Sequence, residues 1–337
     1  MENPGTARDL PDAGGTEYTR LASHPVPVHH GDPAAEYAAL NEGAALVDRS
    51  HGTVLRLVGK KAVEVLNAVL TNEVPEEVNR GVYALLLNPK GRIQTDLRVL
   101  KRGGEVLIDV APEGTEAAKE LLGRYAPFYR VEVEDLAPWG VLGLYGPRAK
   151  GLLDGLELAE HETAEVKLGE ADLLAAGVAV PVPGYDLLGP ADALGAARDH
   201  LLRRDADPAG LHAYETARVE AGVPRFGSDI TPENFPAEAG ILERAVSFEK
   251  GCYPGQETVA RMHYRGHPNK KLHRFVVEGS PASPGTPIFQ NEKRVGEVTS
   301  LAPLPVNGEI FALGYLSRNA DTQDALRAGD ATLRPLA

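Results

Sequence analysis

The chain has 337 residues, of which 43% are hydrophobic and 25% charged, a composition typical of a globular protein with two or three packed domains. Its formal net charge of −13 disfavours broad, non-specific binding to nucleic acid, which depends on Lys and Arg neutralising phosphates. The single cysteine excludes an intramolecular disulfide and cannot by itself build a metal site. The most apolar stretch is too short to span a bilayer, so we expect a cytoplasmic protein.

Residues 1–22 lack the apolar stretch of a signal peptide, and we expect a flexible leader there. The segment 32–43 begins with an aspartate and a proline and ends at a glycine, which predicts a helix. Two later segments, 55–70 and 142–156, each read as an apolar strand, a glycine and an amphipathic helix. This repetition predicts a duplicated α/β module.

The middle and the end of the chain differ in character. A strand-rich module covers about residues 52–136, and in it the turn sequence NPKG at 88–91 separates two apolar strands. A helix predicted over 211–221 is stopped by Gly222 and the proline that follows. Over 273–337, short strands split by proline- and glycine-rich turns predict a small closed β-barrel. The expected fold class is therefore α+β.

The usual enzyme signatures are absent from the sequence. It contains no phosphate-binding loop of the G-x-x-x-x-G-K-[ST] type, no dinucleotide-binding glycine pattern after a strand, no H-E-x-x-H and no C-x-x-C. The chemistry of the chain has to be sought instead in three local groups of polar residues.

The first group lies in the strand predicted around Asp96. If side chains alternate there, Gln94, Asp96 and Arg98 share one face while apolar residues occupy the other. One interpretation is a polar edge that faces solvent. The other is a carboxylate in a cleft, where it accepts hydrogen bonds from ring N–H groups of a ligand.

The second group is formed by Arg218 and Glu220 at the end of a predicted helix. The segment 221–240, rich in helix-breaking residues, follows directly. The two side chains can face a cavity where helix gives way to loop. An ordinary charged helix C-terminus is the alternative.

The third group surrounds the single cysteine. Gly251 and Gly255 bracket Cys252, Tyr253 and Pro254, which predicts a turn with an accessible thiol. Neighbouring positive charge, above all that of the lysine directly before the first glycine, favours the thiolate. The alternative is a cysteine that packs as a small buried hydrophobe.

A basic run continues from this turn. Residues 250–274 hold six Lys or Arg against a single Glu, within a chain that is acidic as a whole. A solvated basic face and a binding surface for an anionic ligand or partner are both open interpretations.

The sequence KGCYPGQETVAR at 250–261 resembles the K-G-C-Y-x-G-Q-E signature of YgfZ-type folate-binding proteins, which are relatives of the aminomethyltransferase (T-protein) of the glycine cleavage system. Three other segments, 39–51, 86–99 and 218–236, agree in order, and the resemblance extends over about residues 32–318. The residues that carry the signature, or support it, are Lys250, Gly251, Cys252, Tyr253, Gly255, Gln256, Glu257 and Arg261.

The resemblance implies two α/β modules and a C-terminal β-barrel arranged as a ring around a central folate cleft. We expect a folate-binding region at 23–240, a connector with the signature at 241–272 and the barrel at 273–337. Tetrahydrofolate is the implied cofactor. The residues expected to bind it are Tyr83, Asp96, Arg218 and Glu220.

The family also implies a function in assembly or repair of iron–sulfur clusters, including those of enzymes that modify tRNA, with iron–sulfur client or assembly proteins as partners. Cys252 and Asp96 are the expected reactive residues. Two alternatives are a folate-dependent aminomethyltransferase or demethylase, and an adaptor that binds an acidic partner or RNA through 250–274.

Departures from the T-protein pattern bear on this choice. Thr95 and Asp96 stand where aminomethyltransferases carry an acidic pair, and Leu187 and Leu188 stand where a Gly–Glu pair is expected. Both weigh against aminomethyl transfer. We therefore expect an accessory protein rather than an enzyme that turns over.

Overall fold

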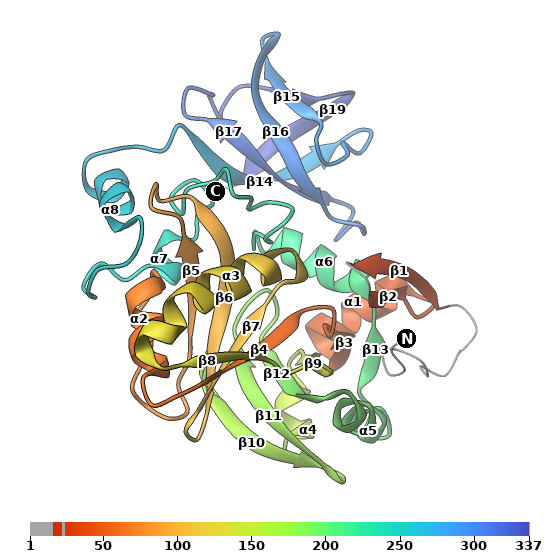
Figure 1. The fold of residues 1–337 in the computed structure, drawn as a ribbon. Coiled ribbons are helices and arrows are strands. Elements are labelled where there is room, and N and C mark those ends of the chain that lie inside the picture. The colour runs from red at the N-terminus through yellow and green to blue at the C-terminus, as the bar shows by residue number, and fades with distance from the viewer. Residues whose placement is uncertain (1–15, 22–23, 337) are drawn as a thin grey trace.

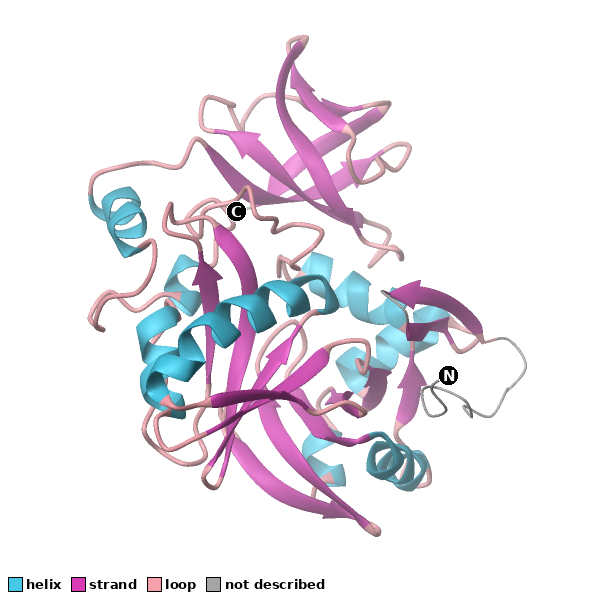
Figure 2. Ribbon diagram, in the orientation of Figure 1, coloured by secondary structure: helices cyan, strands magenta, loops and turns pink. Residues whose placement is uncertain are grey.

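The computed structural model describes residues 16–21 and 24–336. Within these residues, two larger β-sheets form the body of the molecule and a β-barrel lies at one end of it (Figure 1). Helices lie on the outside of the body, and the barrel consists of strands and loops (Figure 2). The predicted α+β architecture with two α/β modules and a C-terminal barrel is confirmed. No helix in the described part of the chain has the length and apolarity needed to cross a membrane.

The first sheet has five strands in the order β5-β6-β7-β4-β8, and neighbouring strands run antiparallel. Helices α2 (Ala62–Val69) and α3 (Thr115–Tyr125) cover one face of it and bury the apolar side chains of alternate strand positions. The strands of this sheet are β4 (Thr53–Val58), β5 (Val82–Leu87), β6 (Ile93–Arg102), β7 (Glu105–Val110) and β8 (Glu132–Asp135). Short 3-10 turns, Pro112–Gly114 and Ala126–Tyr129, flank α3.

The second sheet has six strands in the order β10-β11-β12-β9-β3-β13. Its outer face packs against α4 (Ala149–Leu152) and α5 (Ala191–Leu202). Its strands are β3 (Ala45–Asp48), β9 (Trp139–Tyr145), β10 (Thr163–Leu168), β11 (Ala171–Val178), β12 (Gly184–Pro190) and β13 (Asp207–Ala209). The two predicted strand–glycine–helix units fall one in each sheet, as β4 with α2 and β9 with α4.

The inner faces of the two sheets pack on each other. Apolar residues of the first sheet, among them Val54 and Leu107, share a buried cluster with Leu174 and Leu188 of the second. Since β3 belongs to the second sheet but precedes the whole first sheet in the chain, the two modules are interleaved in sequence.

Helices α1 (Pro33–Glu42) and α6 (Leu211–Glu220) pack together beside the second sheet. The side chain of Asp32 caps α1 by accepting from the backbone N–H groups of Ala34 and Ala35, as its Asp-Pro start predicts. The small sheet of β1 (Glu17–Leu21) and β2 (His24–His29) lies next to them. The flexible leader predicted for 1–22 mostly lies outside the described residues, but its last part forms β1, because pairing with β2 satisfies the backbone there.

The predicted C-terminal barrel is closed, in the order β14-β17-β16-β15-β18-β19. It has its own apolar core, and a second cluster joins it to the end of α6. The barrel strands are β14 (Lys270–Glu278), β15 (Pro287–Gln290), β16 (Lys293–Leu301), β17 (Ile310–Ser317), β18 (Leu326–Ala328) and β19 (Ala331–Leu336). Two short helices, α7 (Leu242–Ala245) and α8 (Gln256–Tyr264), precede it. The division of the chain at 240 and 272 stays a prediction.

Candidate functional site

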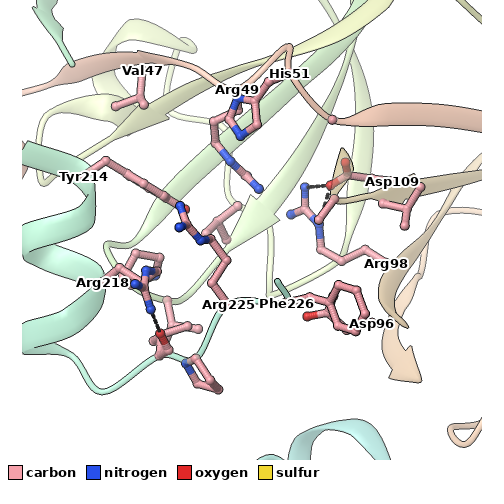
Figure 3. Close-up of a pocket in the computed structure, with 18 of the residues that line it drawn as sticks. Val47, Arg49, His51, Asp96, Arg98, Asp109, Tyr214, Arg218, Arg225 and Phe226 are labelled. Atoms are coloured by element: carbon pink, nitrogen blue, oxygen red, sulfur yellow. Dashed lines mark hydrogen bonds and ion pairs between the residues drawn. The ribbon is translucent and has the colours of Figure 1, made fainter. Parts of the chain in front are cut away.

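A cavity of about 210 Å³ lies where the inner faces of the two sheets meet α6 and the segment 223–226 (Figure 3). Its walls come from β5, β6 and β7 of the first sheet and from β3 and the end of β11 of the second. Five arginines line it, and all but one are closely paired with carboxylates. They are Arg49, Arg98, Arg218, Arg225 and Arg244.

Asp96 and Tyr83 stand together in the wall formed by the first sheet. Side chains along β6 alternate as predicted, so that Asp96 and Arg98 face the cavity while Val99 packs beneath the helices. The hydroxyl of Tyr83 donates to Oδ2 of Asp96 at 2.7 Å. The solvent-facing edge considered above is excluded, since β6 lies between β5 and β7.

The carboxylate of Asp96 lacks a cationic partner. Among the described residues no basic side chain pairs with it, whereas Asp109 is paired with Arg98 and Glu215 with Arg218. Burial raises the pKa of Asp96 above its ordinary value, and the hydrogen bond from Tyr83 acts in the opposite direction. A partly buried carboxylate with open acceptor sites therefore faces the cavity.

Arg218 lines the cavity, but its N–H donors are already used within the protein. Its guanidinium donates to Glu215, Asp229, the hydroxyl of Ser300 and the carbonyl of Val223, at distances of 2.7 to 3.0 Å. The residue is only 4% exposed. Arg218 thus ties α6 to the following loop and to the barrel.

Glu220, expected to act beside Arg218, does not reach the cavity. Its carboxylate accepts a hydrogen bond from the hydroxyl of Tyr37 on α1. Two positions along an α-helix correspond to about 200° of rotation, so side chains at 218 and 220 point to nearly opposite sides. The structure therefore does not bring together these two predicted site residues.

Asp186 is a charged residue of this region that the sequence interpretation missed. It is completely buried in β12, where Oδ2 accepts from Arg49 at 2.6 Å and from Arg98 at 2.5 Å, and the hydroxyl of Tyr145 donates to Oδ1. Burial alone would raise the pKa of Asp186, but the two arginines lower it to about 2. Asp186 thereby fixes both cavity arginines, Arg49 and Arg98, from the buried side. The sequence feature that could have identified Asp186 is a single aspartate within an otherwise apolar strand.

The two leucines that follow Asp186 stand where the family resemblance implied a Gly–Glu pair. Leu187 and Leu188 are both 0% exposed. Leu187 packs under α5, and Leu188 packs between the two sheets. Neither side chain lines the cavity.

The signature around Cys252 docks against the turn between β5 and β6. Cys252 itself is exposed, as predicted, and does not line the cavity. Gly255 directly before α8 has a φ of 83°, and a Cβ there would lie 2.7 Å from the carbonyl oxygen of Asn88 and 2.8 Å from the Cα of Gly91. The backbone of the signature thus approaches this turn more closely than a side chain would allow.

Lys250, whose positive charge was expected to favour the thiolate of Cys252, is bound elsewhere by its side chain. Its ammonium group donates to the carbonyl oxygens of Asn67 at 2.9 Å and Leu70 at 2.6 Å, at the C-terminal end of α2. Carbonyls at a helix C-terminus carry partial negative charge and lack helical partners, which attracts a cation. Burial lowers the pKa of Lys250 to about 8. The side chain fastens the signature to the first module.

Tyr253 is the buried anchor of the signature. It is 5% exposed and belongs to the apolar cluster against which Tyr83 packs. Gln256 and Glu257 form the first turn of α8, and Arg261 in its last turn is exposed. The signature therefore contacts the back of the cavity wall through Tyr253, while its polar residues lie outside the cavity.

The basic run at 250–274 lies elsewhere on the molecule. None of its residues lines the cavity. Several of its cations, such as Arg261, Arg265 and Lys271, are exposed, and Arg274 donates to the carbonyl of Glu220. The run therefore does not reach a ligand held within the cavity walls.

Comparisons with known proteins cover almost the whole chain. The family model described as the GCVT N-terminal domain matches residues 16–250. The chain is 31% identical to an aminomethyltransferase of Rubrobacter xylanophilus over 93% of this chain and 88% of that protein. It is 28% identical to an aminomethyltransferase of Moorella thermoacetica over 90% of this chain and 87% of that protein.

A solved structure has the same fold. The glycine cleavage system aminomethyltransferase T from Bartonella henselae superposes with a TM-score of 0.85 over 96% of this chain and 94% of that chain. Since the two sequences are 23% identical, this likeness bears on the fold alone.

Proposed function

Because the chain belongs to the GCVT N-terminal domain family, related to the aminomethyltransferases, we propose that it binds tetrahydrofolate in the cavity and holds the ring of the cofactor at Asp96. Aminomethyltransferases of this family use tetrahydrofolate as the one-carbon carrier. The observation that carries the proposal is the carboxylate of Asp96, which faces the cavity with Tyr83 as its hydrogen-bond partner.

The chemistry of the two groups is complementary. An ionised carboxylate accepts up to about four hydrogen bonds, and Tyr83 occupies one of these sites. Adjacent N–H groups on a reduced pterin ring can donate side by side to such a carboxylate, which gives the stronger, charge-assisted kind of hydrogen bond. Arg218 has no free donor for a ligand, so we assign it the task of fixing the cavity wall.

Direct titration tests this proposal. Calorimetry of the full chain with tetrahydrofolate and with methylene-tetrahydrofolate should show saturable binding, which Asp96→Asn weakens. The same samples are then assayed for turnover of a one-carbon donor. Wild-type protein that binds neither form of the cofactor would rule out the assignment.

We further propose that this folate-binding protein supports iron–sulfur enzymes, including enzymes that modify tRNA, through Cys252. The support is the exposed thiol within the KGCYPGQE signature, which is docked on the first module, one wall of the cavity, but lies outside the cavity. One thiolate supplies one ligand, whereas an iron–sulfur cluster usually needs four. A cluster handled at Cys252 is therefore shared with a client or assembly protein. The cytoplasmic location expected above is part of this proposal.

Aminomethyl transfer is the second candidate. It is favoured by the relatives named aminomethyltransferase, one of which aligns with 93% of this chain. Thr95 counts against it, because it leaves Asp96 without the second acid of the expected pair. The two buried leucines of β12 also count against it, because they stand where a folate-binding glutamate is expected. Turnover in the assay above, with Cys252→Ser as active as wild type, would favour this candidate over the accessory function.

A further inference from the structure

Arg225 enters the cavity from the segment 223–226 and carries a donor that the protein leaves unused. Figure 3 shows its side chain reaching toward Tyr214 and Arg49 in the middle of the cavity. Its Nε is buried and, within the described part of the chain, has no hydrogen-bond partner. One terminal nitrogen donates to the hydroxyl of Ser228 at 2.7 Å. A buried N–H without an acceptor is unfavourable unless a ligand provides one.

The positive charge of Arg225 is only weakly compensated. Its nearest carboxylate oxygen is Oε1 of Glu215, at 3.3 Å. Glu215 already accepts three hydrogen bonds of 2.8 to 3.0 Å from Arg218. One carboxylate thus serves two arginines, and Arg218 has the better geometry. The guanidinium of Arg225 is therefore open to a second anion.

His51 and Arg49 lie at the same end of the cavity. Nδ1 of His51 is buried, and no described residue hydrogen-bonds to it. Burial, together with the positive charges of Arg49 and Arg225, lowers the pKa of His51 to about 4, so the ring is neutral at physiological pH. Arg49 is held in place by Asp186. Arginines and a neutral imidazole thus converge on one space.

The backbone fixes Arg225 in this position. Its N–H donates to Oδ2 of Asp229 at 3.1 Å, and its carbonyl accepts from the N–H groups of Asp229 and Ile230 at 2.9 and 3.0 Å. The buried carboxylate of Asp229 is in turn held by Arg218 and by Ser300 of the barrel. The loop is thereby fixed before any ligand binds, which lowers the entropy lost on binding.

The geometry points to a carboxylate-binding subsite at this end of the cavity, in which Arg225 supplies the charge and the free N–H, with His51 and Arg49 beside it. The inference rests on the proposed function, because it names what the cavity holds in addition to the ring at Asp96. Two ligands could provide the carboxylate: the glutamate tail of tetrahydrofolate itself, or a separate one-carbon donor of the amino-acid type.

Three probes separate these sources: tetrahydrofolate, 6-methyltetrahydropterin, which has the ring without the glutamate, and sarcosine. We expect the full-length protein to bind tetrahydrofolate roughly tenfold or more tightly than 6-methyltetrahydropterin, and Arg225→Gln to abolish that difference. This result assigns the subsite to the tail. If Arg225→Gln instead no longer binds sarcosine but binds tetrahydrofolate as tightly as wild type does, the subsite holds a separate carboxylate. Both results support the proposal.

The controls keep this inference distinct from the assignment of Asp96. Arg102→Gln changes an arginine outside the cavity, paired with Glu165, and should bind all three probes as wild type does. Asp96→Asn should weaken the binding of both tetrahydrofolate and 6-methyltetrahydropterin. The ratio between the two affinities, which measures the contribution of the tail, should stay unchanged. Thermal unfolding confirms that each variant is folded.

Two outcomes overturn the subsite: a folded Arg225→Gln that binds every probe as tightly as wild type, or Arg102→Gln losing as much affinity as Arg225→Gln. Wild-type protein that binds sarcosine in an Arg225-dependent way but neither pterin refutes the folate assignment alone. Wild-type protein that binds none of the three refutes both.

Discussion

Tyr83 and Asp96 form a hydrogen bond of 2.7 Å between neighbouring strands in the cavity wall. The phenol is a neutral donor, so it orients the carboxylate without cancelling its charge. Arg98, on the same face of β6, is instead turned to Asp109 and Asp186. The carboxylate of Asp96 thus faces the cavity without an arginine from the described residues paired to it.

We predict that Asp96→Asn weakens tetrahydrofolate binding about tenfold or more, since a hydrogen bond to a charged group contributes about 1.5–3 kcal/mol. The asparagine has nearly the same shape but supplies one acceptor oxygen and no charge. Calorimetry at neutral pH measures the effect. Asp172→Asn is the matched control, because Asp172 is exposed on β11 and does not line the cavity. Equal affinity of a folded Asp96→Asn and wild type would refute the placement.

Tyr83→Phe should change how tetrahydrofolate binding depends on pH. Only the ionised carboxylate accepts two ring N–H groups, so binding is complete above the pKa of Asp96 and is lost as the pH falls through it. The hydrogen bond from Tyr83 lowers that pKa against the effect of burial. Removing the hydroxyl therefore raises the pKa and moves the loss of binding to higher pH.

Affinities measured across the acidic range, for wild type and Tyr83→Phe, give the two midpoints. Asp96→Asn serves as the control and should show no corresponding step. A midpoint for Tyr83→Phe that stays at the wild-type pH, or moves lower, contradicts the prediction.

Local patterns were sufficient for some of these features. Alternation along β6 placed Asp96 and Arg98 on one face because strand period depends only on the backbone. Proline and glycine positions marked the turns of the barrel for the same reason. The helix at 211–221 was also found, but treating Arg218 and Glu220 as one pair ignored the helical period, which separates them.

Long-range contacts decided the remaining features. Asp186 meets Arg49 and Arg98 only because β3, β6 and β12, distant in sequence, come together where the sheets pack. Lys250 stands two positions before Cys252, yet its long side chain reaches carbonyls at the end of α2, 180 and 183 residues earlier. Neither the partner nor the direction of such a side chain is contained in its local sequence.

Asp186→Asn should destabilise the fold severely. It leaves Arg49 and Arg98 buried without this shared counter-charge, and breaking a buried ion pair in this way costs about 3–5 kcal/mol. Urea unfolding at neutral pH measures the loss. Asp172→Asn, at an exposed position of the neighbouring strand β11, should leave the free energy of unfolding nearly unchanged.

Wild type and Asp186→Asn should also differ in how their stability depends on pH in the acidic range. The folded pKa of Asp186, about 2, lies below its ordinary value of 3.8. The unfolded chain therefore binds the proton first, and the contribution of Asp186 is fully present above the ordinary value and lost as the pH falls toward 2. This part of the acid destabilisation should be absent from Asp186→Asn. A variant whose stability falls over that range as steeply as wild type would argue against the assignment.

Gly255→Ala and Gly251→Ala should differ, although both glycines belong to the same signature. At Gly255 the φ of 83° and the contact of 2.7 Å with the carbonyl oxygen of Asn88 both oppose a side chain. The backbone strain alone costs about 1–2 kcal/mol. Gly251 has nothing within 4 Å of its Cβ position, so its variant should stay within about 0.5 kcal/mol of wild type. Urea unfolding compares them, and equal losses would refute the docking of the signature on the turn between β5 and β6.

Cys252→Ser should leave both stability and tetrahydrofolate affinity nearly unchanged, because the thiol is exposed and does not line the cavity. Support of iron–sulfur enzymes should nevertheless be lost, since a serine hydroxyl neither ligates iron as a thiolate does nor forms a mixed disulfide. Complementation of cells lacking the native protein, read out as the activity of an iron–sulfur enzyme, provides the measurement. Glu249→Gln, at an exposed position of the same loop, is the control variant and should complement fully. In parallel, the wild-type thiol should react with an alkylating reagent without denaturant. Full complementation by Cys252→Ser, or a thiol that reacts only after unfolding, would refute the role proposed for Cys252 and leave the folate site to stand by itself.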